Sequence, residues 1–255
     1  MQSKNIKLIV LGSANALPDQ QHDNTHFLLV TDRERILIDC PNNPYVRLQQ
    51  AGIDPLQLTG LILTHFHPDH ISGLPTLLMN LWLRKRKNSL AVSGLDSTLQ
   101  LFEKLMALFE WEKWEERFPV ETHPLADRAM QCVFRDQSVE ILSSPVCHLI
   151  PTIGLRINNL QTGQSVAYSC DSEPCTNVIE LARGVKVLFH EAAGEAKGHS
   201  GPRQAGWVAQ QAAVKQLYLI HYPVYEVQPQ QWIAQASQEF QGDIKLAEDG
   251  MAIEF

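Results

Sequence analysis

Three histidines and an aspartate lie within one short segment of the chain, at His65, His67, Asp69 and His70. Imidazole nitrogens and carboxylate oxygens are common ligands of divalent metal ions. Four ionisable groups this close would repel one another or go unsatisfied when buried, unless a positive charge neutralised them. His65 and His67 project to the same side of an extended loop, and the later pair can face a second ion. The segment therefore predicts a coordination site that serves two metals.

One loop cannot complete two such sites, because each zinc ion needs about three to five ligands. Further histidines or aspartates must come from distant parts of the chain. His148, Asp171 and His221 each stand at or just beyond the end of a short apolar run that reads as a strand. Strand ends present side chains to a common edge of a sheet. We therefore expect these three residues to supply the missing ligands.

Hydrophobic periodicity and turn residues predict the elements that must hold these side chains. Strands and helices alternate in both halves of the chain, and no linker or repeat separates the halves. We therefore expect an α/β protein with a single domain over residues 1–255, built as two sheet-plus-helix layers. The predicted strands cover residues 6–11, 25–30, 35–39, 61–64, 90–92, 131–134, 138–143, 152–157, 165–169, 185–189 and 217–220. The predicted helices cover residues 44–50, 72–87, 97–109, 175–182, 202–213 and 229–240.

Composition is that of an ordinary globular protein, with 255 residues, 44% hydrophobic and 19% charged, which suffices for a sizeable core. The net charge of −7 offers no overall field that would attract a nucleic acid. The N-terminus lacks a signal-peptide pattern, and no apolar run approaches the ~20 residues that a membrane span needs. The five cysteines are scattered and do not read as a disulfide framework. We expect a soluble, cytoplasmic protein without a membrane partner.

The motif His65 to His70 matches the H-x-H-x-D-H signature of the metallo-β-lactamase fold superfamily, and the chain resembles its ribonuclease Z-like phosphodiesterase branch. Residues 11–18 and 36–40 resemble the first two motif regions of that branch. The resemblance implies a four-layer αββα sandwich that binds two divalent metal ions. We expect zinc, with manganese or iron as alternatives. By the resemblance, the first ion takes His65, His67, His148 and Asp171, and the second takes Asp69, His70, His221 and the shared Asp171.

A second match lies at residues 190–193 and 198–200, where the branch carries His-Glu-Ala-Thr followed by Gly-His-Ser. Ala193 stands here in place of the threonine. The resemblance implies that His199 contacts the scissile phosphate or protonates the leaving oxygen, oriented by Glu191. A histidine with a carboxylate partner can transfer protons near neutral pH. The alternative is that His199 caps the helix that follows it.

The function that follows is a dinuclear metal-dependent hydrolase, a phosphodiesterase that acts on a small or single-stranded phosphodiester through a metal-bridged hydroxide. Asp69, His199 and Glu191 are its catalytic candidates. Transfer-RNA-processing members of the branch carry a long arm between the third-motif histidine and the bridging aspartate. Residues 149–170 hold that place here and suffice for one hairpin, so a folded transfer RNA is not expected as substrate. Hydrolysis of a lactone, sulfate ester or other ester is the alternative, and a non-catalytic metal-binding protein is a further one.

Several other features leave alternatives open. The basic run at residues 84–87 is either a solvated helix end or a phosphate-contacting patch. His22 either contacts the substrate or belongs to a surface loop. By strand alternation, Cys147 and Cys170 should point into the core.

An apolar stripe at residues 74–82 and the tryptophans Trp111 and Trp114 bear on the oligomeric state. Both features leave room for a homodimer, and buried packing within one subunit explains them equally well. The expected partners are therefore a small-molecule or short phosphodiester substrate and, as an open alternative, a second copy of the chain.

Overall fold

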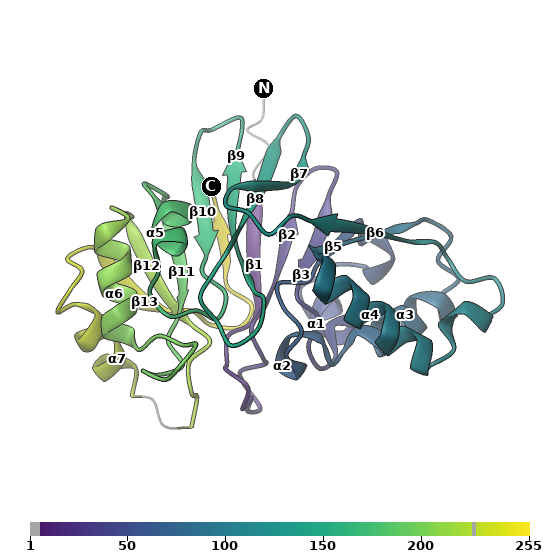
Figure 1. The fold of residues 1–255 in the computed structure, drawn as a ribbon, viewed down its shortest axis with the longest axis horizontal. Coiled ribbons are helices and arrows are strands. Elements are labelled where there is room, and N and C mark those ends of the chain that lie inside the picture. Colours follow the sequence, from purple (N-terminus) through teal and green to yellow (C-terminus); the bar gives the residue numbers. More distant parts are fainter. Residues whose placement is uncertain (1–5, 226–227) are drawn as a thin grey trace.

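The computed structural model describes residues 6–225 and 228–255. Two seven-stranded sheets lie face to face, and helices cover the outer face of each sheet (Figure 1). The strand orders are β14-β1-β2-β3-β4-β5-β6 and β13-β12-β11-β10-β9-β8-β7. The predicted four-layer αββα sandwich is therefore confirmed.

The first sheet takes six of its strands from the N-terminal half of the chain and one from the C-terminal end. Its strands are β1 (Lys7–Gly12), β2 (His26–Val30), β3 (Arg35–Ile38), β4 (Gly60–Ile62), β5 (Leu90–Leu95), β6 (Val120–Leu125) and β14 (Ala252–Glu254). The helices of this half are α1 (Pro44–Gln50), α2 (Pro68–Ile71), α3 (Leu74–Leu83) and α4 (Asp96–Leu108), with short 3-10 turns η1 (Pro55–Gln57) and η2 (Trp111–Lys113).

The second sheet is antiparallel from β7 to β10 and parallel from β10 to β13. Its strands are β7 (Gln131–Arg135), β8 (Val139–Pro145), β9 (Ile153–Asn159), β10 (Ser165–Tyr168), β11 (Val187–Glu191), β12 (Gln216–Ile220) and β13 (Asp243–Leu246). Its helices are α5 (Thr176–Ala182), α6 (Pro202–Gln211) and α7 (Pro229–Ala236). The β9–β10 hairpin takes up most of residues 149–170, as predicted.

Three apolar clusters fill the spaces between the four layers. One lies between the sheets, where Phe27 packs edge-on against Tyr168 and Phe189 with ring centroids 4.8 and 5.2 Å away. The other two join each sheet to its own helices. The central strands are thus buried on both faces, which explains why they read as continuous apolar runs rather than alternating ones.

The main differences from prediction lie at the sheet edges and at one helix. Strands β6, β13 and β14 were not predicted, because they are edge strands with polar, exposed residues and little apolar signal. The helix predicted over residues 72–87 is the shorter α3, which ends at Leu83, and the separate helix α2 precedes it.

Three residues of the basic run beyond α3, Arg84, Lys85 and Lys87, are exposed, as expected of a solvated helix end, whereas the fourth is not. Arg86 is buried, and its guanidinium donates to the backbone carbonyls of Leu56 and Leu58 at 3.0 and 2.8 Å. It also donates to the carbonyl of Ser89 at 2.6 Å. Arg86 therefore ties the end of α3 to the segment that leads into β4.

Cys170 is buried as predicted, but the prediction for Cys147 is wrong, since its side chain is exposed. Strand β8 ends at Pro145, so strand alternation no longer applies at Cys147. Trp111 is buried and packs against Trp114 and Phe118 within the subunit.

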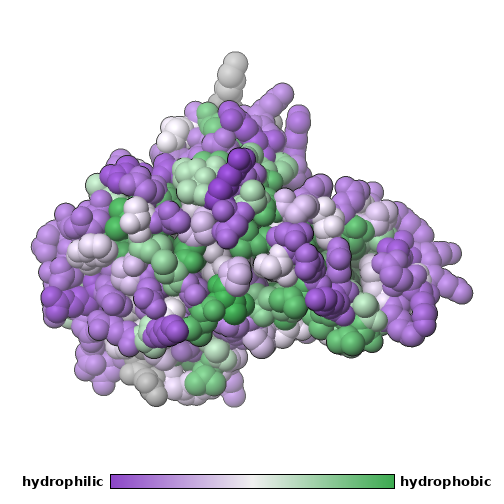
Figure 2. Space-filling model, in the orientation of Figure 1, coloured by the Kyte–Doolittle hydropathy of each residue, from purple (hydrophilic) through white to green (hydrophobic). Residues whose placement is uncertain are grey.

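The view in Figure 2 is dominated by hydrophilic side chains, with smaller apolar patches between them. Among the helices of the described residues, none has the length and apolar character needed to cross a membrane.

Candidate metal centre

All seven predicted ligands lie in segments that follow the ends of strands. The cluster from His65 to His70 follows β4 of the first sheet and runs into α2. His148, Asp171 and His221 follow β8, β10 and β12 of the second sheet. The structure brings these segments together, so the candidate centre lies at the end of the sandwich where these strands of both sheets finish.

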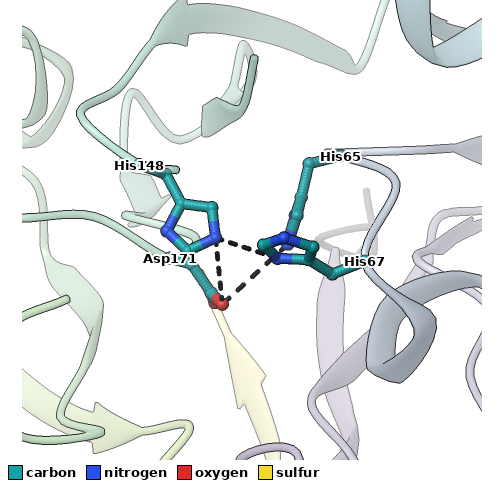
Figure 3. A group of neighbouring side chains, drawn as sticks. All are labelled: His65, His67, His148 and Asp171. Atoms are coloured by element: carbon teal, nitrogen blue, oxygen red, sulfur yellow. Dashed lines mark hydrogen bonds and ion pairs between the residues drawn. The ribbon is translucent and has the colours of Figure 1, made fainter. Parts of the chain in front are cut away.

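The first group consists of His65, His67, His148 and Asp171, whose ligand atoms all lie within 4.8 Å of one another. Their side chains point toward a common position in Figure 3. His148 Nε2 lies 3.0 Å from His67 Nδ1 and 3.9 Å from Asp171 Oδ2. His65 Nε2 also lies 3.9 Å from Asp171 Oδ2.

The second group consists of Asp69, His70, Asp171 and His221, again within 4.8 Å of one another. His221 Nε2 lies 3.3 Å from Asp171 Oδ2, and His70 Nε2 lies 3.5 Å from Asp171 Oδ1. Asp69 Oδ2 lies 3.6 Å from His70 Nε2 and 3.8 Å from His221 Nε2. Asp171 belongs to both groups, so its two oxygens are placed between them.

A buried aspartate that was not among the predicted site residues orients His70. The Nδ1 of His70 donates to Asp39 Oδ2 at 2.9 Å, and Asp39 also accepts from the backbone N–H of Thr64 at 2.9 Å. Because a carboxylate accepts the Nδ1 proton, Nε2 is the nitrogen that faces the centre and would bind a metal ion. Asp39 directly follows β3, so the strand-end argument that ranked the other ligands would also have found it.

Three of the four remaining histidines, His65, His148 and His221, are held in a similar way by their outer nitrogens. His148 Nδ1 donates to the carbonyl oxygen of Gly198 at 2.7 Å. His65 Nδ1 lies 3.1 Å from Thr64 Oγ1, and His221 Nδ1 lies 3.3 Å from Thr25 Oγ1. A partner on the outer nitrogen fixes the ring orientation of a metal-binding histidine. The candidate ligand rings are therefore oriented by a neighbouring residue in the case of His65 and by distant segments in the cases of His148 and His221.

Several inward-facing atoms lack any partner within the described chain. His65 Nε2, His70 Nε2 and Asp171 Oδ1 are buried and make no hydrogen bond. A buried polar atom without a partner costs about 1–3 kcal/mol, and more when it is charged. Imidazole nitrogens and a carboxylate oxygen around one point are a donor set that suits divalent ions such as zinc. The residues present therefore fit metal binding.

Burial and charge favour the metal-binding protonation states of His65 and Asp171, and they favour the protonated form of His70. Burial, together with the neighbouring His70, holds the pKa of His65 well below its usual range. Burial raises the pKa of Asp171, but His221 and His70 outweigh it, so the pKa is well below its usual range. Burial lowers the pKa of His70, but the charges of Asp171 and Asp39 raise it well above its usual range. A neutral His65 and an ionised Asp171 are the ligand forms.

His199 and Glu191 form a pair at the edge of the centre. Glu191 ends β11, is fully buried, and accepts from His199 Nδ1 at 3.0 Å. It also accepts from the N–H groups of Ser172 and Ser200 at 3.1 and 3.0 Å. The Glu191 bond raises the pKa of His199, and burial raises the pKa of Glu191 to about 7. The side chain of His199 is therefore hydrogen-bonded to Glu191. The N-cap residue of helix α6 is Gly201, so His199 does not cap that helix.

His22 lies on the loop between β1 and β2 and belongs to neither ligand group. Its Nδ1 lies 2.9 Å from Asp19 Oδ1, and its ring contacts the edge of Tyr222. His22 and Tyr222 line a cavity of about 740 Å³ together with Asp249, and none of the seven ligand candidates lines it. Asp249 accepts from Ser13 Oγ at 2.7 Å, which ties the C-terminal turn to this loop.

Comparison with known proteins identifies the family and the fold. The family model described as "Anti-Pycsar protein Apyc1" matches residues 6–240. A protein named Ribonuclease Z from Methanothermobacter thermautotrophicus is 27% identical over 264 residues, which cover 85% of this chain and 86% of that protein. The metallo-beta-lactamase fold protein YhfI from Bacillus subtilis superposes with a TM-score of 0.83 at 21% identity, covering 99% and 100% of the two chains. A diphosphatase from the PhnP family superposes with a TM-score of 0.76 at 20% identity, covering 98% and 97%.

Proposed function

The chain belongs to the Anti-Pycsar protein Apyc1 family, and from this premise we propose that it is a dinuclear phosphodiesterase acting on a small or single-stranded phosphodiester. Its relatives named Ribonuclease Z and its metallo-β-lactamase fold make it a metal-dependent hydrolase. The observation that carries the finer proposal is the pair of ligand groups that share Asp171.

Each ligand group would hold one divalent ion. His65, His67 and His148 face the first position, Asp69, His70 and His221 face the second, and Asp171 serves both. Divalent ions bound there would supply positive charge that polarises a phosphate group and acidifies a water molecule. Zinc suits this set of nitrogen and oxygen donors, and manganese or iron would also be accepted.

The chain's own residues would orient the reactants and supply a proton. The side chain of Asp69 is 15% exposed, so it is open to solvent while it faces His70 and His221, and it would orient the attacking water. His199 has Nδ1 bound to Glu191, which leaves Nε2 for a substrate oxygen. Its ring lies between His148 and His221, with centroids 4.9 and 6.1 Å away, and its side chain is 23% exposed. His199 would therefore deliver a proton to the leaving oxygen.

A small or unstructured substrate fits the surroundings of the centre better than a folded RNA does. The β9–β10 hairpin belongs to the second sheet and fills the segment in which an arm would be inserted. The basic residue Arg86 is buried in a structural role, and the net charge is −7. A folded RNA needs a broad basic surface to hold its phosphates.

Substitution of Asp69 tests the proposal. We expect Asp69→Ala to lower turnover of bis(p-nitrophenyl) phosphate at least about a hundredfold, as loss of a group that acts in the transition state does. Asp127→Ala, at an exposed position, is the matched control. A metal-loaded D69A protein with unchanged turnover would remove this assignment. A panel of a cyclic nucleotide, a short oligonucleotide, a lactone, a sulfate ester and precursor transfer RNA then separates the substrate classes.

The role of His199 is tested by changing the leaving group. Removal of a general acid matters most when the leaving oxygen is basic, and general acids contribute about 10²- to 10⁴-fold. We expect His199→Ala to lower kcat on an alkyl phosphodiester by about that factor, and on a p-nitrophenyl diester far less. Equal losses on both substrates would assign His199 to binding instead.

A further inference from the structure

The loop between β11 and α6 contacts the candidate ligand His148 and also carries the proposed proton donor His199. The carbonyl oxygen of Gly198 accepts the Nδ1 proton of His148 at 2.7 Å. The next residue, His199, donates from Nδ1 to Glu191 at 3.0 Å. A displacement of Gly198 would therefore disturb the orientation of a ligand ring and the placement of the proton donor together.

Glu173 holds this loop in place. Its Oε1 accepts from the backbone N–H of Gly198 at 2.6 Å, a short hydrogen bond to a charged acceptor. Its own backbone N–H donates to the carbonyl of Cys147 at 2.8 Å, and the two residues form an isolated antiparallel bridge. Glu173 thus contacts the residue before His148 through its backbone and the partner of His148 through its side chain.

The backbone of Gly198 adopts a conformation that favours glycine and lies close to His148. Its φ is +83°, which residues with a side chain rarely adopt. A Cβ at this position would lie 2.9 Å from Leu149 Cγ and 3.1 Å from His148 Nδ1. The loop therefore lies so close to His148 that a side chain at position 198 would require the neighbours to move. Residues 195–197 of the same loop are exposed and supply little packing of their own.

We propose that Glu173 is a positioning residue that fixes the ring of His148, and hence metal binding in the first group, through the backbone of Gly198. The inference rests on the proposed function in one respect, because it takes His148 as a metal ligand. It assigns Glu173 no contact with substrate. Partners that orient a metal-binding histidine typically contribute about 10- to 100-fold to metal affinity or activity.

The test uses Co²⁺ as the probe, because its visible absorption reports ligand geometry independently of turnover. We expect Glu173→Ala to weaken Co²⁺ binding about 10- to 100-fold in competition with a chelator, with a changed spectrum. Glu173→Gln keeps an oxygen acceptor for the Gly198 N–H, and it should restore affinity to within about threefold. Glu180→Ala is the control, since Glu180 is an exposed residue of α5 paired with Arg183.

On bis(p-nitrophenyl) phosphate, E173A should lower kcat and leave KM nearly unchanged. A lower thermal midpoint with unchanged Co²⁺ affinity and spectrum would overturn the proposal, because it would show a purely structural role. An E173Q variant that binds Co²⁺ as weakly as E173A does would also overturn it. If E173A does not fold, Glu173→Asp is measured in its place. We expect the same loss of Co²⁺ affinity, because the shorter side chain of aspartate does not reach the N–H of Gly198.

The two proposals fail in different ways. Wild-type protein that binds Co²⁺ but hydrolyses no phosphodiester would reject the proposed function. Weaker Co²⁺ binding by E173A than by the wild type would still support the role of Glu173. Wild-type protein that binds no Co²⁺ would overturn the positioning role itself.

Discussion

His190 is a buried histidine that belongs to neither ligand group. It lies on β11, its Nδ1 is 2.8 Å from the carbonyl oxygen of Glu191, and its Nε2 has no partner in the described chain. Burial lowers the pKa of its imidazole from 6.5 to about 4. The unfolded chain therefore binds a proton that the folded chain resists. The resulting loss of stability is absent above pH 6.5 and complete below pH 4.

Replacement of His190 by asparagine should remove this dependence. Each pKa unit corresponds to about 1.4 kcal/mol, so the unfolding free energy of the wild type should fall by about 3 kcal/mol relative to His190→Asn between pH 7 and pH 4. Urea unfolding in the presence of a chelator measures the difference without a contribution from bound metal. A wild-type-to-variant difference that stays constant across this range would contradict the prediction.

At the scale of single residues, the chemistry of metal ligands allowed the candidate site residues to be predicted from the sequence. Few side chains bind metal, and the spacing of His65 to His70 is specific, so the sequence pointed to every side chain of the two ligand groups. Their orienting partners were not predicted. Thr25 is 196 positions from His221, and Gly198 acts through a backbone carbonyl, which leaves no signal in side-chain types.

The loop between β11 and α6 makes a prediction at the scale of elements. Gly198→Ala would force a left-handed residue with a side chain against His148. We expect kcat on a phosphodiester and metal affinity each to fall about tenfold or more. Gly184→Ala is the matched control, because Gly184 has φ +65° and no atom lies within 4 Å of the position that its Cβ would take.

Both substitutions introduce strain of about 1 kcal/mol or more, so both should lower the thermal midpoint. Only G198A should change metal affinity. Equal effects of the two variants on metal binding would show that strain, and not the displacement of His148, is responsible.

Elements buried on both faces were predicted well, and edge elements were not. β10 is buried at all four of its residues, and the apolar run at 165–169 found it. β13 has the residues Asp-Ile-Lys-Leu with alternating exposure, and β14 has only three residues. Their pairing depends on β12 and β1, which a local pattern cannot reveal.

The whole molecule is joined across its two sheets by the ligand groups. His65 to His70 come from the first sheet, and His148, Asp171 and His221 come from the second. A ligand that binds only the folded state stabilises it by about 2.7 kcal/mol at a hundred times its Kd. Removal of metal with a chelator should therefore lower the thermal midpoint by about 5–10 °C.

His221→Ala should reduce this metal-dependent shift, because it removes a ligand of the second group. His123→Ala, at an exposed position of β6, should leave the shift unchanged. Thermal unfolding with zinc and with chelator measures both. A midpoint that does not respond to metal in the wild type would contradict binding to the folded state.

At the scale of the molecule, the layered fold was accessible from the alternation of strands and helices together with the motif resemblance. The single domain over residues 1–255 remains a prediction. The pairing of β1 with β14 closes the first sheet with strands from opposite ends of the sequence, and no local pattern indicates such a contact.

The wide spread of the ligands has a consequence for protein synthesis. His221 comes late in the chain, and β14 pairs with β1 only after residue 254 has been made. Translation proceeds at roughly 5–20 residues per second, so a growing polypeptide spends seconds with His65 to His70 exposed but without their counterparts. A nascent chain that does not yet include His221 and β14 would therefore be inert as a hydrolase.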